Sequence, residues 1–356
     1  KLDFIKVDRF SNQKIKLISI MNNKIIIAVD AMGGENSPQK IVDGIELSLK
    51  DSNENFFKLY GNKDKLNVLI SKKPKINKYC EIIHCDHYIE DEESPLSAAK
   101  KSESTSMWQS IASQINGKSQ ITLSAGNTGA LLILSRLILS MIKGVEKPAL
   151  AGLWPNKIGM NVVLDLGANI ECNDKNLIDF SYMGAALYKA LYPETDPIIA
   201  LLNVGLEEIK GHEEIKKAYQ HLKQSNNKNF NFHGYIEGNH IMDGNVNVIV
   251  TDGFSGNIAL KTAEGTANFI TKNLRENLNK GLLNKISLLF SYNALKRFKN
   301  QLDPRKYNGA IFLGLSGPVV KSHGSTDARG LSYSIKMCNK IVKGNLIEKI
   351  KKNLIK

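Results

Sequence analysis

The stretch Ile121-Thr-Leu-Ser-Ala-Gly-Asn-Thr-Gly129 is an apolar run of strand length that stops at a small, glycine-bearing turn. A helix-like apolar stretch, residues 130–142, follows it. The same order recurs where residues 25–29 lead into Asp30-Ala-Met-Gly-Gly34, 162–166 into Gly167-Ala-Asn169, 198–202 into Asn203-Val-Gly205, and 246–250 into Thr251-Asp-Gly-Phe-Ser-Gly-Asn257. In an α/β sheet such turns collect at the carboxyl ends of parallel strands, where ligands bind.

Strands and helices alternate along the whole chain, which indicates a mostly parallel sheet covered by helices on both faces. With 356 residues, 42% of them hydrophobic, the chain can form one large α/β unit or two closely joined lobes. Ser37 and Pro38 predict a helix start, as N-cap and first helical residue. Residues 177–191 and 212–222 predict helices, and residues 88–106 a surface loop whose last residues cap the next helix.

Composition restricts the partners. The net charge of +13 suits nucleic acid, anionic lipid or an acidic protein, but the lysines are scattered and the sequence contains no nucleic-acid-binding module. No apolar run approaches the roughly 20 residues of a membrane span. The four cysteines show no framework spacing, and the opening segment is too charged for a secretory signal, so we expect a reducing, cytoplasmic compartment. Residues 1–20 are expected to be an extension outside a catalytic unit formed by residues 21–356.

Residues 268–302 have a different pattern, with many leucines interleaved with lysine and arginine and a break at Gly281. This predicts two amphipathic helices that meet at an apolar tip. One interpretation is a pair packed on the core or on a second subunit. The other is a basic, amphipathic tip on an anionic membrane surface, whose apolar residues are Leu282, Leu283, Ile286, Leu289 and Phe290.

Taken together, the turns resemble those of the bacterial fatty acyl-ACP:phosphate acyltransferases, in the order in which that family has them. The strings that carry the resemblance are Val29-Asp-Ala-Met-Gly-Gly34 with Ser37-Pro38, Ser124-Ala-Gly-Asn-Thr-Gly-Ala-Leu131, Leu164-Asp-Leu-Gly-Ala-Asn169, Leu201-Leu-Asn-Val-Gly205 with Lys210-Gly211, Asp252-Gly-Phe-Ser-Gly-Asn257 with Leu260-Lys261, and His323-Gly-Ser325. The sequence departs from the family pattern at Glu35, Lys100 and Ser104, where the family has Asp, Arg and Asp.

The resemblance implies an enzyme that converts long-chain acyl-ACP and inorganic phosphate into acyl phosphate, the acyl donor for phospholipid (phosphatidic acid) synthesis. It implies a fold like phosphotransacetylase and isopropylmalate dehydrogenase, and a homodimer on the inner face of the cell membrane. The helical tip would contact anionic lipid, and the acyl phosphate would pass to a glycerol-3-phosphate acyltransferase. The reaction needs no metal and no cofactor.

The reaction requires placement of two reactants, neutralisation of charge and hydrogen-bond donors for an oxyanion. Orienting the two reactants can supply roughly 7–11 kcal/mol of the barrier. One oxyanion donor is worth about 2.7–4 kcal/mol. Lys210 can supply the cation, and Asn257 can donate its amide to phosphate or to the tetrahedral intermediate. Asp252 is expected to orient these groups. The expected phosphate- and substrate-binding residues lie at the same turns: Asp30, Gly33, Gly34, Ser124, Gly126, Asn127, Thr128, Gly129, Asn169, Asn203, Gly253, Ser255, Gly256, Lys261, His323 and Ser325.

Several of these residues have an ordinary structural interpretation beside the functional one. Lys210 can be a solvated lysine of a surface turn, Asn257 a helix N-cap, and His323 a structural hydrogen-bonding residue. The Cys80–His87 stretch lacks the paired spacing of a zinc site. Cys172 has no evident histidine partner and is expected to be a buried thiol rather than a nucleophile.

Other functions are compatible with the sequence. A phosphotransacetylase acting on short acyl-CoA is the nearest alternative enzyme, and a decarboxylating NAD-dependent dehydrogenase would need a metal-binding set of carboxylates. A non-catalytic protein that binds lipid or acyl phosphate and scaffolds membrane enzymes would place no demand on Lys210.

Overall fold

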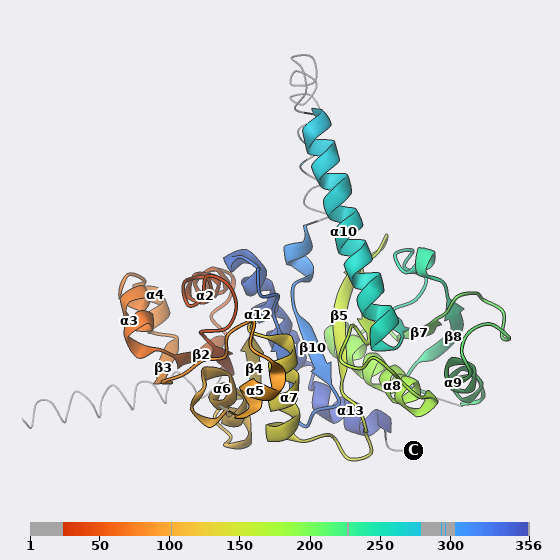
Figure 1. Cartoon of the computed structure of the whole chain (residues 1–356), viewed down its shortest axis with the longest axis horizontal. Helices are drawn as coiled ribbons and strands as arrows, with labels where there is room; N and C mark the ends of the chain where they lie inside the picture. Colours follow the sequence, from red (N-terminus) through yellow and green to blue (C-terminus); the bar gives the residue numbers. More distant parts are fainter. Residues whose placement is uncertain are drawn as a thin grey trace, which may run out of the picture. The chain divides into compact units, whose positions relative to one another are not determined.

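The computed structural model describes residues 24–100, 102–225, 228–278 and 303–354, with residues 293 and 296. Two compact units form the chain (Figure 1). Unit 1 contains the described residues up to Lys143 together with Gly309–Lys351, and unit 2 contains Gly144–Asn308 with the residues from 352 onward. Helix α13 (Leu346–Leu354) ends the described chain.

Unit 1 contains a six-stranded sheet in the order β3-β2-β1-β4-β11-β10, parallel except for the pair β10–β11. Its elements are β1 (Ile25–Asp30), α2 (Gln39–Asp51), β2 (Asn55–Gly61), α3 (Lys63–Ser71), α4 (Pro74–Asn77), β3 (Cys80–His84), α5 (Pro95–Lys100), η1 (Ser102–Ser104), α6 (Ser106–Ile115), β4 (Ile121–Ser124), α7 (Thr128–Leu139), β10 (Ala310–Leu313), β11 (Val319–Lys321) and α12 (Ala328–Lys343).

Helices cover both faces of this sheet. The connections β1-α2-β2 and β3-α6-β4 run across the sheet in opposite directions. Because parallel crossovers are right-handed, α2 and α6 lie on opposite faces. Helix α12 packs against α2 so closely that a Cβ on Gly44 would lie 2.7 Å from Leu331 Cδ2.

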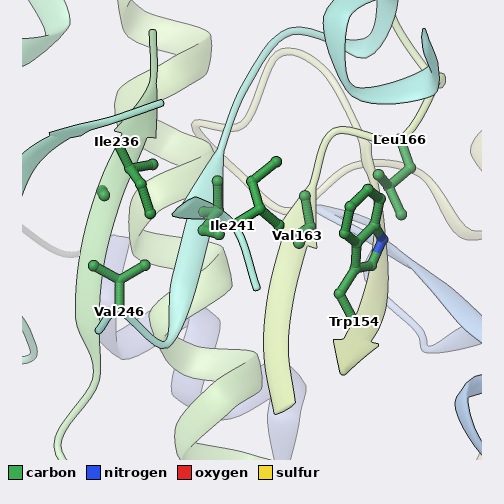
Figure 2. Packing of buried hydrophobic residues seen from close by; sticks show 8 residues of the cluster. Trp154, Val163, Leu166, Ile236, Ile241 and Val246 are labelled. Carbon is green, nitrogen blue, oxygen red and sulfur yellow. The ribbon is translucent and has the colours of Figure 1, made fainter. Parts of the chain in front are cut away.

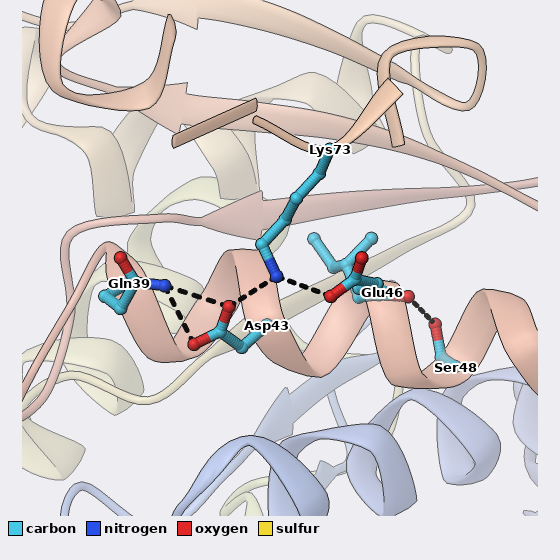
Figure 3. Close-up of polar contacts among 6 residues, drawn as sticks. Gln39, Asp43, Glu46, Ser48 and Lys73 are labelled. Atoms are coloured by element: carbon cyan, nitrogen blue, oxygen red, sulfur yellow. Dashed lines mark hydrogen bonds and ion pairs between the residues drawn. The ribbon is translucent and has the colours of Figure 1, made fainter. Parts of the chain in front are cut away.

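An ion-pair cluster ties the outer side of α2 to the start of α4 (Figure 3). Lys73 Nζ lies 2.7 Å from Asp43 Oδ1 and 2.5 Å from Glu46 Oε2. Gln39 Nε2 donates to Asp43 Oδ1 at 2.9 Å. These groups are partly exposed, so each pair is worth about 0–1 kcal/mol.

Unit 2 contains a five-stranded sheet in the order β5-β6-β9-β7-β8, parallel except for the pair β5–β6. Its elements are β5 (Ala149–Pro155), β6 (Met160–Leu164), α8 (Asp174–Leu191), β7 (Ile198–Leu202), α9 (Glu213–Gln224), β8 (Asn231–Ile236), η2 (Gly238–His240), β9 (Val248–Val250), α10 (Gly253–Leu278) and η3 (Pro304–Tyr307).

The two faces of the unit 2 sheet are covered by different helices. Val163 and Ile249 belong to a buried cluster with Trp154 (Figure 2), against which Ala259 and Leu260 of α10 pack. Their strand neighbours point the other way, since side chains alternate along a strand. On that second face α8 approaches so closely that a Cβ on Gly184 would lie 2.6 Å from Val248 Cγ1.

The predicted fold class, a mostly parallel α/β sheet with covering helices, is confirmed. All five apolar runs are strands, and the predicted helices are α2, α7, α8 and α9. The predicted start of α2 is wrong, because Pro38 is the N-cap and Ser37 Oγ instead donates to Gly33 O at 2.7 Å. The predicted loop 88–106 contains α5 and η1, and Thr105 caps α6 by accepting from Trp108 N at 3.3 Å.

The first helix of the predicted pair corresponds to α10, whose C-terminal half extends away from the strands of its unit (Figure 1). The remainder of the pair, including the tip residues Leu282, Leu283, Ile286, Leu289 and Phe290, lies outside the described residues. Among the described helices, none has both the length and the hydropathy of a bilayer span.

Replacing Ile249 by Ala tests the core of unit 2. Ile249 is fully buried, so the loss of its methyl groups should destabilise the protein by about 2–5 kcal/mol. The matched control is Ile158→Ala, at a residue that is 80% exposed, which should change stability by about 0.5 kcal/mol or less. Urea unfolding checks both, and equal losses would contradict the packing described for this cluster.

Candidate functional site

Unit 1 brings three polar side chains together at the carboxyl ends of neighbouring parallel strands. Asp30 ends β1, Ser124 ends β4 and Lys321 ends β11. The strand register pairs Asp30 with Ser124, and Ser124 with Lys321. This is the edge of an α/β sheet at which ligands bind.

Asp30 ties the surrounding turns together. Its carboxylate, 1% exposed, accepts hydrogen bonds from Ser106 Oγ at 2.6 Å and Ser124 Oγ at 2.8 Å. Gly126 N in turn donates to Ser124 Oγ at 3.1 Å. Burial raises the pKa of the Asp30 carboxyl, against the opposing effect of the two serine hydroxyls. Asp30 therefore organises the turns rather than facing a ligand as a free anion.

The two glycine turns of this unit touch each other. A Cβ on Gly33 would lie 2.6 Å from Gly126 N, so only glycine permits the approach. The backbones of the 33–34 and 125–126 turns therefore lie together at the strand ends. Backbone N–H groups in such glycine turns can approach an anion closely.

Asn127 and Gly129 make structural contacts in this turn. Asn127 caps α7, since its Oδ1 accepts from Ala130 N at 3.0 Å. Its Nδ2 donates to the carbonyls of Asp91, at 2.8 Å, and Glu93, at 3.0 Å. A Cβ on Gly129 would meet Pro95 Cγ at 2.6 Å. The side-chain amide of Asn127 thus holds the preceding loop, and Thr128 opens α7.

His323 and Ser325 lie on the exposed turn after β11. His323 Nδ1 lies 3.0 Å from Ser325 Oγ. The backbone of Gly324 between them is half-buried, and its carbonyl accepts from Glu35 N at 3.1 Å. The turn that follows β11 is therefore joined to the Gly33-Gly34 turn.

Unit 2 has its own set of strand-end turns, organised by a second buried carboxylate. Asp165 Oδ1 accepts from the amides of Leu150, Gly167 and Ala168 at 3.0, 3.1 and 2.9 Å. Asp165 Oδ2 accepts from both the backbone N and the Nδ2 of Asn169, each at 2.8 Å. Burial raises the pKa of the Asp165 carboxyl although these hydrogen bonds oppose it. Asn169, predicted to bind substrate, is engaged in this network and with Pro148 O at 2.6 Å.

The start of α10 packs directly on this loop. A Cβ on Gly253 would lie 2.3 Å from Asn169 O, and one on Gly256 would lie 1.9 Å from Asp165 O. Asp252 caps the helix, since its carboxylate accepts from Ser255 N at 2.8 Å and Ser255 Oγ at 2.9 Å. Asp252 and Ser255 are therefore each other's partners, and the two glycines allow the close contact.

Lys210 lies on an exposed loop that Asn203 closes. Asn203 Nδ2 donates to Gly205 O at 3.2 Å and to Lys210 O at 3.1 Å. The Lys210 side chain is exposed, and within the described part of the chain it forms neither an ion pair nor a hydrogen bond. Its ammonium group is available to a ligand.

Asn257 lies in the second turn of α10, and its side chain lies over Gly167, whose φ is +121°. The amide makes no hydrogen bond to the residues that the structure describes. The interpretation of Asn257 as an N-cap is wrong, because Asp252 has that role. Lys261 differs, since its Nζ pairs with Glu264 Oε2 at 2.7 Å on the helix surface.

Ser106, Lys40 and Lys321 also lie at these strand ends, and the sequence pattern does not predict a role for them. Ser106 comes from α6, 76 residues from its partner Asp30 along the chain. Lys321 closes the short apolar run Val319-Val-Lys321 directly before His323-Gly-Ser325, which is the signal that could have identified it. Lys40 looks like any lysine in a first helical turn, and only burial distinguishes it.

The cysteine thiols do not have the properties of catalytic nucleophiles. Burial raises the pKa of the Cys172 thiol to about 11, so it is protonated at neutral pH and a poor nucleophile. Burial likewise raises the pKa of Cys80 and of Cys85 to about 12. Within the described ranges, His, Cys, Asp and Glu side chains form no group of three or more that could hold a metal ion.

Comparison with known proteins reveals the family. The model of the family described as fatty acid synthesis protein matches residues 25–349. A phosphate acyltransferase of Pelagibacter ubique is 56% identical over 334 residues, which is 94% of this chain and 100% of that protein. One from Caulobacter vibrioides is 40% identical over 334 residues, 94% of this chain and 92% of that protein. The chain belongs to the phosphate acyltransferase family. This confirms the resemblance drawn from the turns and the predicted enzyme class, an acyltransferase.

Solved structures share the fold at low sequence identity. A phosphotransacetylase from Streptococcus pyogenes has a TM-score of 0.61 at 15% identity and covers 95% of this chain and 98% of its own. One from Staphylococcus aureus has a TM-score of 0.60 at 13% identity, covering 93% and 97%. The predicted phosphotransacetylase-like fold is therefore confirmed.

Gly256→Ala tests the contact between α10 and the Asp165 loop. The added Cβ would lie 1.9 Å from Asp165 O, so the helix start must shift and stability should fall by about 1–3 kcal/mol. Gly265→Ala, in the same helix with open space around it, is the control and should be neutral or stabilising by up to about 1 kcal/mol. Thermal unfolding followed by circular dichroism measures both. A neutral Gly256→Ala would rule out the contact.

Proposed function

We propose that this protein transfers a long-chain acyl group from an acyl carrier protein to inorganic phosphate, reversibly, and forms acyl phosphate for phospholipid synthesis. The observation that carries the proposal, in a chain of this family, is a pair of side-chain donors in the segments that follow the neighbouring strands β7 and β9, neither of which has a partner within the described part of the chain. Lys210 offers an ammonium group there, and Asn257 an amide. The net charge of +13 suits an acidic carrier protein, since complementary charge speeds encounter.

The mechanism follows from what these groups can donate. A phosphate oxygen attacks the thioester carbonyl carbon, the carbonyl oxygen becomes an oxyanion, and the C–S bond then breaks to release the carrier thiolate. Lys210 neutralises the charge on phosphate or on the oxyanion, and the Asn257 amide donates to the same intermediate. Asp252 orders the start of α10, because its carboxylate accepts from the N–H and the hydroxyl group of Ser255. Within each unit, the glycines of the strand-end turns offer backbone amides to an anion. Asn127, Asn169 and Asn203 instead hold these turns in shape.

The nearest alternative is a phosphotransacetylase acting on short acyl-CoA, because enzymes of that kind share this fold. A non-catalytic lipid-binding scaffold is the third candidate. Purified protein incubated with phosphate and either palmitoyl-ACP or acetyl-CoA separates them. Phosphate-dependent release of carrier thiol only from palmitoyl-ACP supports the proposal. Release only from acetyl-CoA supports the transacetylase, and no release from either, with retained liposome binding, supports the scaffold.

The proposal includes a homodimer that associates peripherally with the cytoplasmic face of an anionic membrane, close to a glycerol-3-phosphate acyltransferase. The support on unit 2 is the exposed C-terminal half of α10, where Phe269 is 69% and Ile270 51% exposed. Exposed apolar side chains of this size on one helix suit a partner surface. The interleaved lysines and leucines of residues 268–302 suit an anionic lipid surface.

Lys210→Ala and Asn257→Ala should each lower turnover by about 100-fold, since each removes one donor to the transition state. Lys217→Ala, an exposed lysine of α9 paired with Glu214, is the control and should keep normal turnover. Acyl phosphate formation at saturating substrate measures all three. Near-normal turnover of both site variants, with folding intact, would remove these residues from the mechanism.

Replacing Leu282 and Leu283 by Glu should move the protein from anionic liposomes to solution while activity on soluble acyl-ACP is kept, because charged residues oppose insertion of an apolar tip. Lys217→Glu, which changes charge elsewhere, is the control. Liposome flotation measures the shift. Unchanged binding of the double variant would argue for the core or a subunit interface instead.

A further inference from the structure

Two lysine side chains are buried in unit 1 beside the glycine turns. Lys40, from the first turn of α2, is 5% exposed, and Lys321, at the end of β11, is 9% exposed. Lysine is almost never buried unless its charge is compensated. The sequence pattern alone indicates a role for neither lysine.

The partners of both ammonium groups are neutral carbonyl oxygens. Lys40 Nζ donates to Gly324 O, and Lys321 Nζ donates to Ser322 O at 2.5 Å and to Ala125 O at 3.4 Å. Neither lysine has a carboxylate within ion-pair distance among the residues that the structure describes. An ammonium has three N–H donors. Two donors of Lys40 and one of Lys321 are therefore left for another acceptor.

The two ammonium groups share one small region. A Cβ on Gly34 would lie 2.8 Å from Lys40 Nζ, 2.6 Å from Ala125 O and 3.0 Å from Gly324 O. Lys321 donates to the same Ala125 carbonyl, so both charges lie around the Gly34 turn. Gly34 has a φ of +82°, and its missing side chain lets the Lys40 ammonium group and the two carbonyls come this close to the turn.

The carboxylates near Lys40 and Lys321 form no ion pair with either lysine in the part of the chain that the structure describes. Asp91, on the loop held by Asn127, attracts both lysines, Glu35 attracts Lys40, and Asp30 attracts Lys321. Asp91 is exposed to water, and Asp30 is already bonded to two serine hydroxyls. Coulomb energy falls with distance, so a multiply charged anion in contact with both ammonium groups outweighs carboxylates that lie farther away and are solvated, as Asp91 is, or already hydrogen-bonded, as Asp30 is.

We propose that Lys40 and Lys321 form a binding site for a phosphoryl dianion, namely the inorganic phosphate acceptor or the phosphoryl group of acyl phosphate. The identification of this dianion as a substrate or product rests on the proposed function. A dianion matches two fixed positive charges, and the tetrahedral arrangement of its oxygens can accept the three spare N–H donors. The phosphodiester of a carrier protein's prosthetic arm carries one charge and matches the pair less well.

The affinity of this site for phosphate should depend on pH through Lys321. Burial, together with the charge of Lys40 and against the attraction of Asp91 and Asp30, lowers the pKa of Lys321 to about 8. Above that pH Lys321 becomes neutral in the free protein while phosphate stays dianionic. The affinity for phosphate should therefore fall as the pH rises through about 8, in the wild-type protein without any substitution.

The experiment measures binding of inorganic phosphate by calorimetry, and the KM for phosphate in the acyl-transfer assay, for wild type, Lys40→Met and Lys321→Met. Each substitution removes a charge-assisted donor, so the dissociation constant and the KM should rise about 10-fold or more. The KM for the acyl donor should be unchanged. Lys343→Met is the control, since this exposed lysine of α12 pairs with Glu54 at the surface. Circular dichroism reports folding, and the pH series on wild type needs no variant.

The outcomes separate the inference from the proposed function. Normal acyl phosphate synthesis with unchanged phosphate binding in both variants would overturn the site and leave the function standing. Phosphate binding that depends on the lysines, in a wild-type protein that makes no acyl phosphate, would support the site and reject the function. A rise only in the KM for acyl-ACP, an equal effect of Lys343→Met, or a wild-type affinity that is flat between pH 7 and about 9.5 would each overturn the site.

Discussion

Buried carboxylates hold the strand-end turns of each unit in place. Asp30 draws two serine hydroxyls from different elements into unit 1, and Asp165 gathers the amides of its own turn in unit 2. A buried carboxylate is costly unless its oxygens accept several hydrogen bonds, so each of these groups demands a defined loop around it. The strand-end turns are thus built around acceptors whose hydrogen bonds are already made within the protein.

Glycine makes the second contribution to these turns. In unit 1 the approach of Gly33 to Gly126 leaves no room for a side chain, and in unit 2 the start of α10 presses on the Asp165 loop through Gly253 and Gly256. Such contacts bring backbone amides and helix N-termini to the sheet edge, where an anion benefits from both. Lys210 and Asn257, whose side chains have no partner among the described residues, are suited to a transient negative charge.

Family membership and geometry support the proposed chemistry in different ways. The relatives establish which kind of enzyme this chain resembles over nearly its whole length. The geometry indicates which individual residues hold the structure together and which can bind a ligand. Asn127, Asn169, Asn203 and Asp252 hold loops and helix ends. The side chains of Lys210 and Asn257 donate to none of the residues that the structure describes. Lys261 is the weakest of the predicted ligands, because its charge is already paired with Glu264.

The sequence by itself determined the five strands that lead into glycine- or asparagine-bearing turns, and the parallel α/β class, because apolar runs and such turns are local patterns. It also identified most of the polar residues at the strand ends, since those residues follow the runs directly. It misplaced the start of α2 and missed α5, where local signals such as Ser37-Pro38 compete with contacts made elsewhere. Only the tertiary structure distinguished an occupied amide from a free one, and buried Lys40 and Lys321 from the many solvated lysines. Burial and hydrogen-bond partners come from segments distant in the chain, such as Ser106 for Asp30 and Ala125 for Lys321, so no local pattern could reveal them.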